Sequence, residues 1–152
     1  MFQKILVAFD GSEQGEHALT AAVELAKQFR SALTVLSIIP IQVVPFPGPI
    51  PVPRLTAEDV EAYRATVSAR VEKIDRTGIG SVTTVILEGY VIEAIIEYLE
   101  QHAQDLVVVG ARGLSAAGRL FLGSVSEAIV HHASCPVLVY RIKAHGKGPK
   151  SK

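Results

Sequence analysis

Short apolar runs alternate along the chain with longer segments in which apolar residues recur at helical spacing. The apolar runs predict buried β-strands over residues 4–9, 32–39, 82–87, 106–109 and 136–142. The periodic segments predict helices over residues 13–30, about 56–76, 91–102 and 124–132. Because a helix separates each strand from the next, all five strands can run parallel in one sheet. The pattern therefore predicts a doubly wound α/β fold with helices on both faces of the sheet.

Cap and turn residues support these boundaries. Ser12 stands before Glu13 and Glu16, and a hydroxyl followed by acids is typical of a helix N-terminus. Thr56 precedes the second predicted helix in the same way, and Gly78 lies where that helix should stop. The two longest connections are expected after the second strand and after the fourth, where residues 111–123 carry three glycines and little regular pattern.

The connection after the second strand is rich in proline. Six of the eight prolines lie between residues 40 and 53, five of them at alternate positions. Proline lacks an N–H group and fixes φ, which precludes a helix and disfavours a central strand. We expect residues 40–53 to form a stiff, extended loop that acts either as a lid or partner-docking strip, or as an inert spacer.

Composition places the chain among ordinary globular proteins. Its 152 residues are 49% apolar, which predicts one domain over residues 1–142 with a conventional core. Cys135 is the single cysteine, so an intramolecular disulfide and a multi-cysteine zinc site are both excluded. Neither a leader segment nor an apolar run of the roughly 18 residues that a membrane span needs is present. We therefore expect a cytoplasmic protein without a membrane anchor.

Charge is balanced over the whole chain but not along it. The segment from Arg141 to the end holds five basic residues and no acid, which leaves ten basic against fifteen acidic residues before it. A body of net charge −5 does not favour a nucleic-acid backbone, because phosphate neutralisation requires a positive face. Residues 143–152 are expected to be a flexible basic tail, either merely solvated or in contact with an anionic partner.

Candidate binding groups gather after the fourth predicted strand. Ligands of doubly wound sheets bind beyond the carboxyl ends of the strands, which here draws attention to the loops after the first, second and fourth strands. Gly110 and Gly113 follow the fourth strand, and Gly123 precedes Ser124 and Ser126 at the first turn of a helix. Free N–H groups at a helix N-terminus bind anions, with hydroxyls as extra donors and Arg112 or Arg119 as a source of charge.

Two common phosphate motifs do not fit. In a P-loop reading that starts at Gly118, Ser124 stands where the lysine should be and Val125 where the magnesium-binding hydroxyl should be. A dinucleotide fingerprint would need more glycines after the first strand than the lone Gly11. Both motifs are excluded.

The spacing instead resembles that of another family. Gly110, two residues, Gly113, nine residues, Gly123 and then Ser124 match the pattern of ATP-binding universal stress proteins, as do KILVAFDGSE, GARGLS and GSVSEAIVHHASCPVLV. The resemblance covers about residues 2–142. It implies an adenine nucleotide alpha hydrolase-like fold with strand order 3-2-1-4-5 and a stress-response role.

The same resemblance implies site residues and partners. Asp10 would lie near the ribose or a nucleotide-bound Mg²⁺, Ile38 would offer backbone groups to adenine, and the glycines and serines would hold the phosphates. The cofactor-binding residues expected on this basis are Ala8, Phe9, Asp10, Ile38, Val109, Gly110, Arg112, Gly113, Gly123, Ser124, Val125 and Ser126. The ligand would be ATP, or ADP or AMP, with Mg²⁺ possible. A homodimer through the edge strand Val137–Tyr140 is also implied.

Simpler interpretations stay open for several of these residues. Asp10 is a common former of Asx-turns, and Gly110 and Gly113 can serve only to end a strand. After the third strand the family often has Gly, then Asp or Asn, then Pro, whereas this chain has Gly89, Tyr90 and Val91. That change places an aromatic ring near the rim of the sheet, where it either alters the pocket mouth or packs locally.

Catalysis has little support in the sequence. His131 and His132 are adjacent, so they point about 100° apart on a helix and do not form a chelating pair. Asp10 is the single carboxylate in the strand-exit loops, and no histidine is placed beside it. We expect a regulatory ATP-binding protein. The alternatives are slow ATP hydrolysis or autophosphorylation at Ser124 or Ser126, and a nucleotide-free dimeric interaction module.

Overall fold

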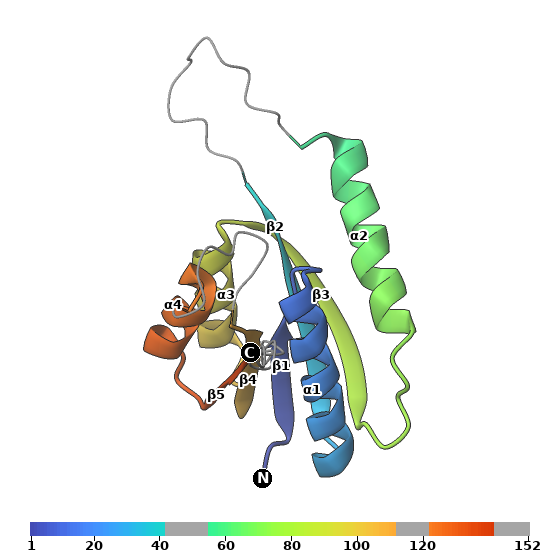
Figure 1. Cartoon of the computed structure of the whole chain (residues 1–152), viewed down its shortest axis with the longest axis vertical. Helices are drawn as coiled ribbons and strands as arrows, with labels where there is room; N and C mark the ends of the chain where they lie inside the picture. Colours follow the sequence, from blue (N-terminus) through green and yellow to red (C-terminus); the bar gives the residue numbers. More distant parts are fainter. Residues whose placement is uncertain (42–54, 112–121, 142–152) are drawn as a thin grey trace, which may run out of the picture.

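The computed structural model describes residues 1–41, 55–111 and 122–141 (Figure 1). Strands and helices alternate in the predicted order. They are β1 (Lys4–Ala8), α1 (Glu13–Phe29), β2 (Ala32–Pro40), α2 (Ala57–Glu72), β3 (Ser81–Gly89), α3 (Val91–Gln101), β4 (Leu106–Gly110), α4 (Ser124–His132) and β5 (Val137–Tyr140). The expected proline loop beyond Ile41, and the tail, lie outside the described residues.

The strands form one parallel sheet in the order β3-β2-β1-β4-β5, which confirms the expected topology. The first two crossovers move from β1 toward β3, and the last two move toward β5. Because crossovers between parallel strands are right-handed, α1 and α2 cover one face and α3 and α4 the other (Figure 1). The winding direction thus switches between β1 and β4, and all four helices begin at the carboxyl edge of the sheet.

The core has one hydrophobic cluster on each face of the sheet. Val7, Leu33 and Val35 contact α1 and α2, whereas Leu6 and Leu36 contact α3 and α4. Both sets of side chains are buried because both faces are covered. This explains why the central strands are nearly continuous apolar runs rather than alternating ones.

Strand β2 continues four residues beyond the end of β1. Ala8 is level with Leu36, and β2 then pairs with β3 as far as Pro40 opposite Gly89. The sequence predicts that β2 stops before Pro40, but the N–H of Ile41 donates to the Gly89 carbonyl at 3.0 Å. Successive residues of a strand point their backbone groups to opposite edges, so the missing N–H of Pro40 belongs to the edge that faces away from β3. A proline at this position therefore leaves the β2–β3 ladder intact.

Helix α2 ends earlier than its sequence predicts. The prediction reaches about Arg76, whereas the helix stops at Glu72 and the N–H of Ile74 bonds to the Val71 carbonyl in a tighter turn. The Asp75 carboxylate accepts hydrogen bonds from Lys27 Nζ at 2.5 Å and from the Thr77 N–H at 3.0 Å. The turn made by Asp75 and Thr77 competes with the helix, and the distant contact with Lys27 on α1 holds Asp75 in place.

Helix α2 also buries few apolar side chains for its length. Of its 16 residues only Val67 and Val71 are buried. Ion pairs attach it to its neighbours: Arg64 to Glu88 on β3, and Arg70 to Glu16 on α1, both at 2.6 Å. Its first turns reach past the end of β1 (Figure 1).

Candidate functional site

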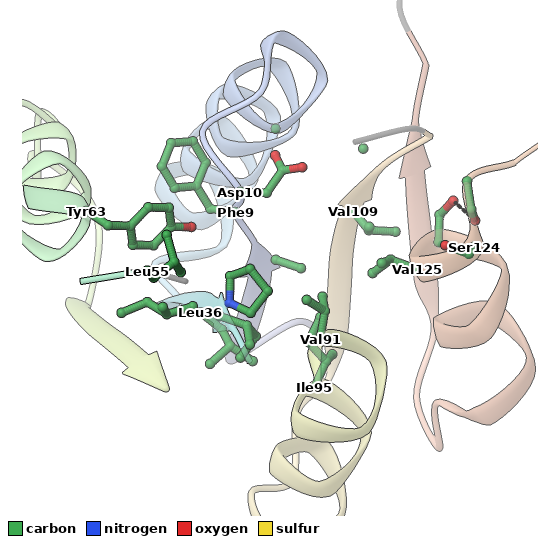
Figure 2. Close-up of a pocket in the computed structure, with 18 of the residues that line it drawn as sticks. Phe9, Asp10, Leu36, Leu55, Tyr63, Val91, Ile95, Val109, Ser124 and Val125 are labelled. Carbon is green, nitrogen blue, oxygen red and sulfur yellow. Dashed lines mark hydrogen bonds between the residues drawn. The ribbon is translucent and has the colours of Figure 1, made fainter. Parts of the chain in front are cut away.

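A pocket of about 550 Å³ lies at the carboxyl edge of the sheet, where the winding direction switches (Figure 2). All four helices contribute to its wall, α1 and α4 through their first turns and α2 and α3 through their first two. Its described lining residues are Ala8, Phe9, Asp10, Gly15, Leu36, Ile38, Ile39, Pro40, Leu55, Asp59, Tyr63, Val91, Ile95, Val109, Gly110, Gly123, Ser124, Val125 and Ser126. Ten of the twelve expected site residues are among them, and Arg112 and Gly113 lie outside the described residues.

Asp10 sits in the turn between β1 and α1 and is part of the helix cap. Its Oδ1 accepts from the Ser12 N–H at 3.0 Å and from the Ser12 hydroxyl at 2.6 Å. Ser12 Oγ in turn accepts from the Gly15 N–H at 3.0 Å. A Cβ on residue 15 would lie 2.6 Å from Asp10 Oδ1, so glycine is required for this arrangement. The turn therefore fixes Asp10, and the same carboxylate also faces the pocket (Figure 2).

The β4–α4 end of the pocket is held together by Ser126. This residue is 1% exposed, and its hydroxyl lies 3.0 Å from the Ala111 carbonyl and 2.9 Å from the Gly123 carbonyl. The Gly123 N–H also donates to the Ala111 carbonyl at 2.7 Å. A hydroxyl has one proton to donate, and Ser126 uses it on these two acceptors. The Ser126 hydroxyl is thus engaged within the protein, and its backbone N–H is the group left for the expected role as a phosphate donor, whereas Ser124 is exposed at the start of the helix.

Gly110 has a packing reason for its missing side chain. A Cβ at this position would lie 3.0 Å from the backbone carbon and oxygen of Gln14 on α1. Close approach of α1 to β4 therefore requires glycine here, whatever the pocket holds. Gly110 still lines the pocket, so its two interpretations are compatible.

The end of β2 presents backbone groups toward the pocket that no other described residue bonds. The Phe9 N–H donates to the Leu36 carbonyl at 2.8 Å, which shows that the groups of Leu36 face β1. Ile38 faces the same edge by strand alternation, but β1 has already ended there. The Phe9 carbonyl, which would continue the ladder, instead accepts from the Ser37 hydroxyl at 2.7 Å. Ile38 thus offers an N–H and a carbonyl to this gap, and Pro40 adds only a carbonyl.

Sequence reasoning missed the residues that α2 and α3 bring to the pocket. Tyr63 and Leu55 form one side, and Val91 and Ile95 lie across from them (Figure 2). The rule about switch points selects loops after β1, β2 and β4, so it gives no weight to the first turns of α2 and α3. In a parallel sheet every crossover helix begins at the edge where ligands bind. This rule would have pointed to the first turns of α2 and α3. Tyr90, by contrast, is 53% exposed and caps α3 outside the described lining.

Acidic groups dominate the charge around the pocket mouth. Asp10 and Asp59 are the charged side chains in the described lining. Hydrogen bonds from the Thr56 N–H and hydroxyl hold the pKa of Asp59 below its usual value. The first turns of the four helices also carry acids, which favour each helix dipole: Glu13 and Glu16, Glu58 and Asp59, Glu93, and Glu127.

Within the described ranges, no cluster of three or more histidine, cysteine or acidic residues is arranged to hold a metal ion. The described lining also contains no histidine, lysine or cysteine. The described part of the pocket wall therefore offers oxygen and backbone groups for binding, and its candidate bases and nucleophiles are Asp10, Asp59, the Tyr63 phenol and the serine hydroxyls. Among the helices described, none has the length and apolar character needed to cross a membrane.

Comparisons of the sequence with a family model and with known proteins all point to the same family. A model of the universal stress protein family matches residues 1–141. A universal stress protein of Thermus aquaticus is 33% identical over 141 residues, covering 93% of this chain and 100% of its own. One of Bacillus subtilis is 33% identical over 150 residues, again covering 93% and 100%.

Solved structures agree with the fold. The universal stress protein UspA of Lactobacillus plantarum superposes with a TM-score of 0.74 and 26% identity, covering 93% of this chain and 99% of its own. A universal stress protein in complex with cAMP has a TM-score of 0.65, 22% identity and coverages of 91% and 97%. The universal stress protein of Archaeoglobus fulgidus in complex with dAMP has a TM-score of 0.65, 22% identity and coverages of 93% and 98%. These neighbours share the adenine nucleotide alpha hydrolase-like fold.

Proposed function

The chain belongs to the universal stress protein family, and we propose on this premise that its pocket binds an adenine nucleotide as a regulatory ligand. ATP is the favoured nucleotide, with ADP and AMP as alternatives. One observation carries the proposal: the same pocket contains a strand edge at Ile38 without a neighbouring strand and a helix N-terminus at Gly123 and Ser124. The first suits a heterocyclic base and the second suits phosphate.

Each part of the pocket has a role in this proposal. The Ile38 N–H and carbonyl would bond to the edge of adenine, whose amino group is a donor and whose ring nitrogens are acceptors. Val109, Ala8 and Gly110 would line the ribose, and backbone N–H groups at 124–126 would face the phosphates. Asp10 is held in place by its own turn, and its carboxylate suits a ribose hydroxyl or nucleotide-bound Mg²⁺.

Two neighbours support an adenine nucleotide as the ligand class. One universal stress protein was solved in complex with cAMP and another in complex with dAMP. Both carry an adenine base but differ in their phosphate, so they favour base recognition as the shared element. The choice of ATP for this chain rests on the spacing of Gly110, Gly113, Gly123 and Ser124.

A regulatory role fits the chemistry of the walls better than rapid turnover. In the described lining, only Asp10 and Asp59 could accept a proton at neutral pH, and both already accept hydrogen bonds from a helix cap. A ligand that binds one conformation better than another shifts the population toward it, and partner choice can follow. A stress-response function would then depend on which nucleotide occupies the pocket.

The direct test is to purify the protein without added nucleotide, denature it and identify any released small molecule by mass spectrometry. A separate native sample, freed of any bound nucleotide, is then titrated with ATP, AMP and cAMP by calorimetry. Gly123→Val is the test variant, because the φ of −69° and ψ of 156° at Gly123 suit any residue while the side chain would crowd the helix start. Ser134→Val, exposed beyond the other end of α4, is the matched control.

We expect adenine nucleotide in the wild type and the control, and little in Gly123→Val with unchanged circular dichroism. A wild type that is empty and binds none of the three nucleotides would refute the proposal and favour the interaction module. Production of ADP, or a mass increase of one phosphate, would instead favour the enzyme alternative. Ser124 would then be the acceptor, since Ser126 is buried and its proton is engaged.

We also propose a homodimer through β5 and a cytoplasmic location. β5 is an edge strand of the sheet, and its Leu138 is 37% exposed. Light scattering at micromolar concentration should give twice the monomer mass, and Leu138→Lys should give the monomer. Thr83→Lys, exposed on the opposite edge strand, should leave the dimer intact. A monomeric wild type would contradict this interface.

A further inference from the structure

Tyr63 on α2 is a pocket residue that neither the family pattern nor the strand-exit loops include. It lies 26 positions from Ser37, and its hydroxyl is 2.7 Å from Ser37 Oγ. Ser37 Oγ donates to the Phe9 carbonyl at 2.7 Å, and a carbonyl only accepts. Because the single hydroxyl proton of Ser37 is already donated to Phe9, the Tyr63 hydroxyl must be the donor in the bond between the two side chains. The tyrosine ring is therefore anchored directly over the end of β1.

The place of a bound base follows from the strand geometry. β1 ends at Ala8, and β2 goes on to Pro40 with the Ile38 backbone facing the gap. A flat ring bonded to Ile38 takes the position that β1 would have occupied beyond Phe9 if the strand had continued. It then lies roughly in the plane of the sheet, and its two faces point toward the two helical layers.

Side chains from both layers border that gap. Ser37 and its partner Tyr63 are on the face covered by α1 and α2, together with Val35 and Val67. Val91 and Ile95 of α3 contact the opposite cluster, which contains Leu36 and Ile38. Figure 2 shows Tyr63 on one side of the pocket and Val91 with Ile95 on the other.

We propose that Tyr63 is a specificity-determining residue whose ring covers one face of the bound base, while Val91 and Ile95 cover the other. This rests on the proposed function and deepens it: the ligand class becomes a nucleotide with a flat aromatic base, held by its faces as well as its edge. Aromatic–base contact contributes enough that deleting the ring weakens binding by about 5- to 150-fold.

The test compares Tyr63→Leu with Tyr63→Phe by calorimetry, using adenosine, AMP and ATP as ligands. Leucine keeps an apolar side chain without the ring, and phenylalanine keeps the ring without the bond to Ser37. We expect Tyr63→Leu to weaken all three ligands by a similar factor, because Tyr63 lies at the base end, away from α4. Tyr63→Phe should stay within a few-fold of wild type.

Tyr90→Leu is the matched control, since Tyr90 is exposed beside the pocket and outside its described lining. A second readout uses tyrosine emission, which is visible because the chain has no tryptophan and four tyrosines. Stacking should change the emission of the wild type and of Tyr90→Leu on adenosine binding. Tyr63→Leu should lose most of that change.

Failure of this inference is distinct from failure of the proposed function. A wild type that binds adenosine, AMP and ATP while Tyr63→Leu binds them equally well overturns the role of Tyr63 alone. Equal losses in Tyr63→Phe and Tyr63→Leu would reduce Tyr63 to a structural anchor of α2. If the wild type binds none of the three ligands, no base is bound for Tyr63 to cover, and both the proposed function and the role of Tyr63 are overturned.

Discussion

Ser126 illustrates how a single hydroxyl can join the end of a strand to the start of a helix. It bridges the carbonyls of Ala111 and Gly123, the two described residues that flank the loop between β4 and α4. Ser126→Ala should destabilise the fold by about 0.5–1.5 kcal/mol, because the hydroxyl bond is lost while both carbonyls keep a backbone donor, the N–H of Gly123 for Ala111 and the N–H of Glu127 for Gly123. Urea unfolding monitored by circular dichroism measures this directly.

Ser124→Ala is the matched comparison at the same helix start. Ser124 is exposed, so its loss should change stability by less than about 0.5 kcal/mol. The order would reverse for phosphate binding, where Ser124 is the accessible hydroxyl. Equal stability of the two variants would show that the bridge made by Ser126 contributes little.

Cys135 should be a slow nucleophile in the folded protein. Burial raises the pKa of its thiol, and the negative charge of Asp105 raises it further. The raised pKa keeps the thiol protonated to higher pH, and only the thiolate reacts with disulfide reagents. At pH 8 the folded chain should therefore react more slowly than the chain in urea, with a pH midpoint shifted upward. Matching rates in the two states would contradict this expectation.

At the scale of elements, α2 is expected to open independently of the sheet. It buries two side chains, whereas α1 buries five residues, including Ala18, Leu19 and Ala22. Exposed ion pairs such as Arg64–Glu88 contribute little to stability and are weakened by salt. Amide hydrogens in α2 should exchange at least about tenfold faster than those of α1.

Val71→Ala sharpens the same measurement. Val71 is one of the two buried anchors, so the variant should speed exchange in α2 and leave α1 unchanged. Addition of salt should act in the same direction by weakening the ion pairs. Exchange of α1 and α2 at a common rate would mean that both helices unfold with the whole domain.

The order of elements was predictable because local pattern decides it. Apolar runs and helical spacing place every strand and helix, and Ser12 and Thr56 both act as the side-chain caps that their sequence indicates. The end of α2 was not predictable in this way. Asp75 ends it in a turn that is held in place by Lys27, which is 48 residues away, and no local pattern contains that partner.

For the molecule as a whole, the position of the site was predictable but only part of its wall was. Topology places the pocket at the switch point, and Asp10, Ile38 and Gly123 line it. Tyr63 depends on α2 reaching past the end of β1, which is a matter of tertiary placement. The weak amphipathic pattern of α2 gave no sign of the face it turns toward the pocket.

The acids in the first turns of all four helices give the pocket mouth a kinetic property. Glu13, Glu58, Glu93 and Glu127 stand at the helix starts, on the same edge of the sheet as the pocket although outside its described lining, and they would repel a highly charged ligand as it approaches. Salt screens such repulsion at distances beyond roughly 10 Å. In stopped-flow measurements the association rate constant of ATP should rise several-fold from low to physiological ionic strength, and that of adenosine should stay constant. If the association rate constant of ATP falls instead, attraction governs the encounter. If it rises, the acids at the helix starts slow the entry of nucleotides in proportion to their negative charge.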